Sequence, residues 1–122
     1  MIQEDYCSYE VAKLLKEKGF DEPLVNYYYT AKGERVGYLL MPEVQYLCPT
    51  HQIAMKWLRE KRWIISIIPK SFYADGRCTS WTYSIWADDN LEIDGEEEWE
   101  NIYGSYEEAV EAALKYSLEN LI

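Results

Sequence analysis

Residues 49–68, PTHQIAMKWLREKRWIISII, carry the strongest fold signal in the chain. Residues 50–61 have helical spacing, with Thr50 in the N-cap position. The predicted buried stripe consists of Ile53, Ala54, Trp57 and Leu58. Residues 63–68 form a continuous apolar run, which predicts a strand covered on both faces and ended by Pro69. A helix that leads directly into a buried strand is a natural folding centre.

Two further helices have marked ends. The first begins at Ser8 and ends at Gly19, after which Phe20 is placed to pack back on Leu15 in a Schellman motif. The last begins with Ser105-Tyr106-Glu107-Glu108, which fits the capping box. Its predicted apolar stripe consists of Val110, Ala113, Leu114, Ser117, Leu118 and Leu121.

The remaining segments predict short strands. Residues 24–30 are rich in strand-forming side chains, a turn follows at residues 32–33, and residues 36–40 and 44–48 are shorter candidates. Residues 79–87 alternate between apolar and hydroxyl side chains, which predicts an antiparallel strand paired with residues 63–68 across a turn at Asp75-Gly76.

These signals predict one α+β domain over residues 1–122. We expect a small antiparallel sheet of about four strands with three helices packed mainly on one face. The expected element order is α-β-(β)-(β)-α-β-β-α. Residues 1–7 are expected to be a weakly ordered lead-in, and residues 88–104 an acidic connection.

Composition excludes several classes of protein. The 122 residues carry a net charge of −10, which opposes binding to nucleic acids and to anionic membranes. No apolar run approaches the roughly 20 residues of a membrane helix, and residues 1–5 do not open a signal peptide. The three scattered cysteines, Cys7, Cys48 and Cys78, are typical of a reducing compartment. We expect a cytoplasmic protein.

One pair of residues is a weak candidate for chemistry. Cys48 lies three residues before His51, the only histidine, and this spacing could be half of a metal site or a cysteine–histidine nucleophile and base. A tetrahedral zinc needs two more ligands, and Cys7 and Cys78 could supply them only through the fold. No phosphate-binding or dinucleotide motif occurs. We therefore expect no cofactor, no metal and no catalytic centre.

Protein interaction is the favoured hypothesis. Tyr27 and Tyr29 share one face of a predicted strand, and Trp86 could extend an aromatic surface for a partner or a homodimer through the sheet face or an edge strand. A strand with its tyrosine face packed under a helix is the structural alternative. The second hypothesis is an acidic inhibitor that mimics DNA and binds a basic host protein through Glu96, Glu97 and Glu98, whose structural alternative is a solvated acidic loop. A small Cys/His enzyme is the third.

Three segments together resemble a family of small proteins from gut Bacteroidales and their prophages or mobile elements. They are residues 8–20 (SYEVAKLLKEKGF), 49–60 (PTHQIAMKWLRE) and 106–115 (YEEAVEAALK), and the middle one is the most specific. The family has no established activity, so the resemblance assigns no site residues. It implies a small accessory protein of a bacterial cytoplasm, with phage derivation as one origin.

Overall fold

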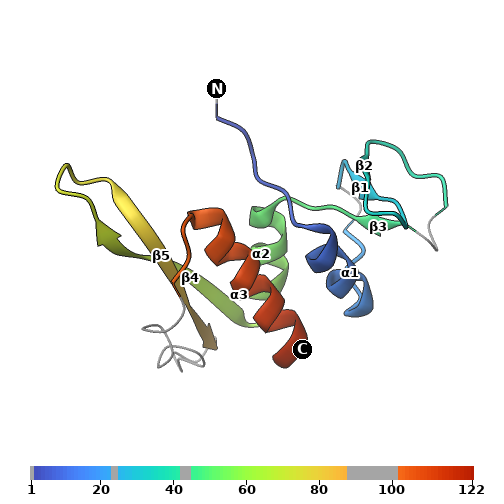
Figure 1. Ribbon diagram of the computed structural model, residues 1–122. Coiled ribbons are helices and arrows are strands. Elements are labelled where there is room, and N and C mark those ends of the chain that lie inside the picture. The colour runs from blue at the N-terminus through green and yellow to red at the C-terminus, as the bar shows by residue number, and fades with distance from the viewer. Residues whose placement is uncertain (1, 23–24, 42–44, 88–101) are drawn as a thin grey trace.

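The computed structural model describes residues 2–22, 25–41, 45–87 and 102–122 (Figure 1). Its class is α+β, as predicted. The elements, in chain order, are α1 (Tyr9–Glu17), β1 (Tyr28–Tyr29), β2 (Arg35–Val36), β3 (Tyr46–Leu47), α2 (His51–Glu60), β4 (Trp63–Phe72), β5 (Cys78–Ala87) and α3 (Tyr106–Asn120).

The strands form two antiparallel sheets, whereas the sequence predicted one. One sheet has the order β2-β1-β3, and the other is the β4-β5 hairpin. The three helices lie between them, so the sheets occupy opposite ends of the molecule (Figure 1). Helix α2 follows β3 almost at once, and its 10 residues span about 15 Å at 1.5 Å per residue. The chain is thereby carried away from the first sheet before β4 begins.

The β4-β5 hairpin confirms the predicted pairing and refines its details. Ile65 pairs with Ile85 and Ile67 with Tyr83, and these side chains pack toward the helices. The opposite face is partly open, since Ile64 is exposed, so the expected covering of both faces is wrong for this strand. Strand β4 also continues through Pro69 to Phe72, with irregular pairing after the proline. An edge strand tolerates a proline where the missing N–H would point outward.

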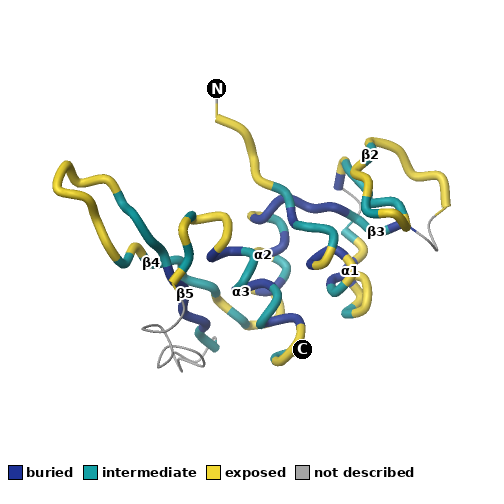
Figure 2. Tube along the Cα trace, viewed as in Figure 1, coloured by how far each residue is buried: buried dark blue, intermediate teal, exposed yellow. Residues whose placement is uncertain are grey.

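Helices α2 and α3 cover only the part of the hairpin nearest the core, and the outer part projects into solvent (Figures 1 and 2). The main core lies between the helices and the inner part of β4. Its fully buried large side chains include Val11, Leu15, Leu58, Val110, Leu114 and Leu118. Among the described residues, no helix has the length and apolarity needed to cross a membrane.

The predicted caps are present at all three helix starts. The side chains of Ser8, Thr50 and Ser105 accept hydrogen bonds from the backbone N–H groups three residues later. At the end of α1, Phe20 N donates to Leu15 O, and Gly19 N donates to Lys16 O. These two bonds form the Schellman motif expected from the sequence.

Residues 5–7 are held in place, although the sequence predicted a weakly ordered lead-in. Cys7 N donates to Pro49 O at 2.9 Å, and His51 N donates to Asp5 O at 2.9 Å. Tyr6 forms an antiparallel bridge with Thr50. The segment is ordered because it meets a complementary backbone segment 43 residues further along the chain, which no local pattern indicates.

Gly19→Ala should lower the free energy of unfolding by about 1 kcal/mol, because Gly19 has φ +91° and a Cβ is disfavoured there. No atom lies within 4 Å of the added Cβ, so the cost is in the backbone alone. Gly104→Ala is the matched control, since its Cβ would meet Glu108 at an ordinary 3.6 Å. Urea denaturation measures both variants. Equal stability of the two variants would contradict this account of Gly19.

Candidate functional site

Three side chains from distant parts of the sequence meet at one point. Cys7 precedes α1, His51 is the first residue of α2, and Glu111 lies on α3. One candidate ligand atom from each of them lies within 4.8 Å of the other two. We call this group the Cys7–His51–Glu111 cluster. The cluster lies where the starts of α1 and α2 meet the side of α3.

His51 is fixed by its place at the start of α2. Its backbone N–H is one of the helix N–H groups that lack an intrahelical acceptor, and Asp5 O accepts it. Its Nε2 lies 2.8 Å from Glu111 Oε1. The imidazole is almost fully buried, which makes this contact a shielded one rather than a surface ion pair.

Glu111 receives two hydrogen bonds on the same oxygen. Ser8 N donates to its Oε1 at 2.8 Å, and His51 Nε2 lies at the same distance. Burial acts to raise the pKa of this carboxyl, but the hydrogen bonds from His51 and Ser8 outweigh it and lower the pKa overall. The carboxylate form is therefore the one that the fold stabilises.

Cys7 is fully buried, and its backbone is held by several bonds. Besides donating to Pro49 O, it accepts hydrogen bonds on its carbonyl from Tyr29 Oη at 2.7 Å and from Cys48 Sγ at 3.6 Å. Burial, and then the charge of Glu111, raises the pKa of the Cys7 thiol. The thiol is therefore neutral at pH 7, in a position that its neighbours fix.

An acidic pocket of about 440 Å³ lies beside the cluster. His51 and Glu111 form part of its wall. Three further carboxylates line it, those of Asp5, Glu107 and Glu108. The pocket thus connects two members of the cluster with solvent.

A second feature lies at the three-stranded sheet. Residues 38–41, YLLM, connect β2 toward β3 and expose four consecutive large apolar side chains. We call this segment the apolar loop. Its backbone is held by buried Gln45, whose Oε1 accepts from Leu40 N at 2.6 Å and from Met41 N at 2.7 Å. Gln45 Nε2 also donates to Tyr38 O at 3.2 Å. Three hydrogen bonds from one buried side chain therefore hold the backbone of a loop that has an apolar surface.

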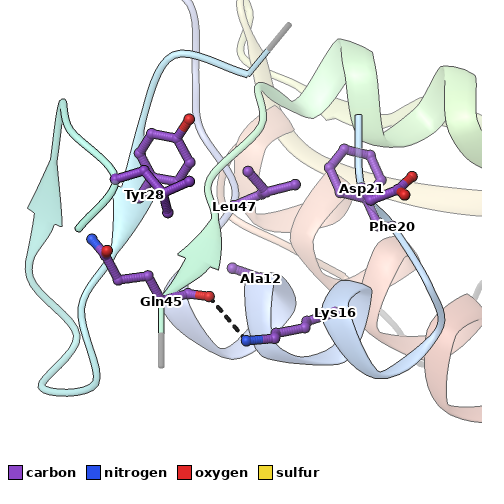
Figure 3. Close-up of a pocket in the computed structure, with 8 residues that line it drawn as sticks. Ala12, Lys16, Phe20, Asp21, Tyr28, Gln45 and Leu47 are labelled. Atoms are coloured by element: carbon purple, nitrogen blue, oxygen red, sulfur yellow. Dashed lines mark hydrogen bonds between the residues drawn. The ribbon is translucent and has the colours of Figure 1, made fainter. Parts of the chain in front are cut away.

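A cavity of about 260 Å³ borders the apolar loop. We call it the α1–β3 cavity. Its lining is mainly apolar and consists of Ala12, Phe20, Tyr28, Leu39 and Leu47, with Lys16, Asp21 and Gln45 also present. Figure 3 shows Lys16 reaching toward Gln45, whose backbone oxygen accepts a hydrogen bond from Lys16 Nζ at 3.1 Å.

The aromatic residues singled out in the sequence have structural partners. Tyr27 packs edge-on against Tyr6, and Tyr29 packs against Tyr9 while donating to Cys7 O. Trp86 pairs with Ile64 in the hairpin and is half-buried. Tyr29 lies in β1 and Tyr27 directly precedes that strand, whereas Trp86 lies in β5 of the other sheet, so the three residues do not form one patch. Residues 96–98, the glutamates of the acidic hypothesis, lie outside the described residues.

The sequence suggested Cys48 as the partner of His51. In the structure, the cysteine in the cluster with His51 is Cys7. Burial raises the pKa of the Cys48 thiol, and Tyr29 and Arg35 oppose this shift only in part. Cys78 is in the hairpin. Sequence reasoning named Cys7 only as a further ligand of a Cys48–His51 site, and it missed Glu111. The available signal for Cys7 was its position directly before a helix cap, but nothing local marks Glu111 among the many acids of α3.

The fold and the cluster together define an α+β protein with a buried cysteine–histidine–glutamate group at the junction of its helices. No family model matches the chain, and neither the curated proteins nor the solved structures contain a significant match.

Glu111→Ala should lower the free energy of unfolding at pH 7 by about 2 kcal/mol, because it removes the acceptor of two partly buried, charge-assisted hydrogen bonds. The folded pKa of Glu111 is lowered, so its stabilisation is complete above the ordinary glutamate pKa and is lost as pH falls through the folded pKa. Urea denaturation in the presence of chelator should therefore show the gap between wild type and variant narrowing in acid. Exposed Glu107→Ala is the control. A gap that widens in acid would contradict the assignment.

The three thiols should react with a disulfide reagent in two phases. Cys78 is partly exposed and should react first, whereas Cys7 and Cys48 are fully buried and should react only as the protein unfolds. Their raised pKa values lower the thiolate fraction further. Cys78→Ser should remove the fast phase. Three equal phases in the native protein would contradict the described burial.

Proposed function

We propose that the protein is a non-enzymatic, cytoplasmic interaction module that binds a protein partner through the apolar loop and the α1–β3 cavity. The observation that carries this proposal is the ordered loop, which presents four large apolar side chains while a buried glutamine holds its backbone. Exposed apolar surface of this kind marks interaction sites in soluble proteins. An accessory role also fits the resemblance carried by the three helical segments.

The size of the cavity favours a protein segment over a small molecule. Its volume of about 260 Å³ is below the range of about 300–1,000 Å³ that is usual for ligand pockets. It suits one or two side chains of a partner, which is how central anchor residues bind at interfaces. The partner we infer is a polypeptide that inserts an aliphatic or aromatic side chain into the cavity and packs its flank on the apolar loop.

The charged groups at the cavity favour one orientation of the bound partner. Lys16 and Asp21 carry opposite charges and both line the cavity. Lys16 Nζ is held by Gln45 O and lies over the ring of Tyr46, 5.0 Å from its centre. A partner whose anchor is flanked by polar groups can satisfy such a rim without burying an unpaired charge. Apolar contact supplies most of the affinity, so the binding should resist salt.

The acidic DNA-mimic inhibitor is the second candidate function. It is supported by the net charge of −10 and by the acidic pocket beside the cluster. Its binding to a basic protein would depend on exposed charges, which about 0.3–0.5 M salt screens to a Debye length of roughly 4–6 Å. Salt therefore separates the two candidates.

Leu40→Asp should reduce capture of the partner by at least about tenfold, because a carboxylate would have to be desolvated in an apolar interface. Photo-crosslinkers placed at Leu40 and, as a control, at Phe72 locate the surface in a native bacterial lysate washed at low and high salt. Phe72 is a matched control because it is also highly exposed, 59% against 73% for Leu40, and lies at the other end of the molecule. Phe72→Asp should leave capture unchanged.

Each outcome of this experiment decides the proposal. A salt-resistant crosslinked product at Leu40 that is lost in Leu40→Asp supports the proposal. If that product contains two copies of the chain, the partner is a second copy and the complex is a homodimer. Crosslinked products confined to Phe72, or capture that is lost only in a Trp86→Ser variant, would show that the binding surface is on the β4-β5 hairpin instead. Capture that disappears at high salt would favour the acidic inhibitor, and no product at either salt would overturn the proposal.

A further inference from the structure

We propose that the Cys7–His51–Glu111 cluster binds a divalent transition metal ion, with Zn²⁺ as the preferred ion. The inference is independent of the proposed interaction surface. It begins from the meeting of one thiol, one imidazole and one carboxylate, with candidate ligand atoms within 4.8 Å of one another. Three such ligands and one open position are typical of zinc sites that retain a bound water.

The three candidate ligand atoms lie within 4.8 Å of one another, a looser limit than the spacing of a tetrahedral site. With metal–ligand bonds of about 2.0–2.3 Å, tetrahedral ligand atoms lie about 3.3–3.7 Å from one another. His51 Nε2 and Glu111 Oε1 are now 2.8 Å apart, at hydrogen-bond distance. They need to separate by roughly half an ångström to admit the ion, a movement within reach of the partly exposed Glu111 side chain.

The ligands are already oriented by neighbouring groups, as metal ligands usually are. Cys7 is fixed through its backbone by Pro49 and Tyr29. His51 is fixed by its position in α2, and Glu111 accepts a hydrogen bond from Ser8 N. Little conformational freedom therefore remains to be lost when the ion binds.

The donor set selects the class of ion. One sulfur, one nitrogen and one oxygen suit a borderline ion such as Zn²⁺ better than Mg²⁺ or Ca²⁺, which prefer oxygen ligands alone. Binding exchanges the thiol proton of Cys7 for the metal and releases it to solvent. The thiolate and the carboxylate then balance the two positive charges of the ion. The acidic pocket, which His51 and Glu111 line, leaves access on their side of the cluster for the fourth ligand, a water molecule.

Cobalt(II) titration of the full chain tests the site directly. Co²⁺ accepts the same ligands, and a thiolate–cobalt bond gives a near-ultraviolet charge-transfer band that a purely structural role of Cys7 would not produce. We expect one ion per chain, displaced by Zn²⁺. Cys7→Ser should abolish the charge-transfer band, and His51→Asn and Glu111→Gln should weaken binding by at least about 10- to 100-fold, the effect of losing even an outer partner of a ligand.

The controls separate the cluster from general attraction of cations. Cys48→Ser alters a buried thiol beside the cluster but outside it, and Glu107→Gln alters an acid of the same pocket. Both should retain the band and the affinity. If circular dichroism shows that Cys7→Ser does not fold, Glu111→Gln decides, since Glu111 is partly exposed and its substitution keeps the shape of the side chain. Absence of a one-to-one complex, a band that survives Cys7→Ser, or equal weakening by Glu107→Gln would overturn the proposal.

Discussion

The structure depends on the backbone pairing of residues 5–7 with residues 49–51. Cys7 N donates to Pro49 O and His51 N donates to Asp5 O, so the N-terminal segment satisfies a donor at the start of α2 that the helix itself leaves without an acceptor. The same pairing places Ser8, the cap of α1, where its N–H reaches Glu111 of α3. One short contact thus joins the starts of α1 and α2 beside α3, whose packing on them completes the core.

The helices also separate the two sheets. Helix α2 is attached to the N-terminal segment at its first residue and leads directly into β4 at its last turn. The turn between them is tight, and Arg62 adopts φ 76° there, a conformation that most residues avoid. Strands β3 and β4 leave α2 at opposite ends and belong to different sheets.

The sequence was informative wherever a signal is local. Ser8, Gly19 and Phe20 mark α1 completely, because capping and left-handed geometry involve residues only a few positions apart. The hairpin turn was predicted for the same reason, since Gly76 supplies its positive φ. The single sheet was wrong because strands of two residues carry too little pattern to indicate their partners. The Cys7–His51–Glu111 cluster escaped prediction because its members are separated by 44 and 60 positions along the chain.

Helix α1 links the two proposed sites while leaving them chemically distinct. Cys7 and Ser8 at its start belong to the cluster region, and Ala12 and Lys16, one and two turns later, line the α1–β3 cavity. A rigid helix that is fixed at its start by a metal would also hold the floor of the cavity in place. Coupling of this kind requires two arrangements of α1 that both sites influence. Metal binding at the cluster is followed by its charge-transfer band, whereas partner binding is followed by crosslinking at the apolar loop. Each proposal can therefore fail without the other.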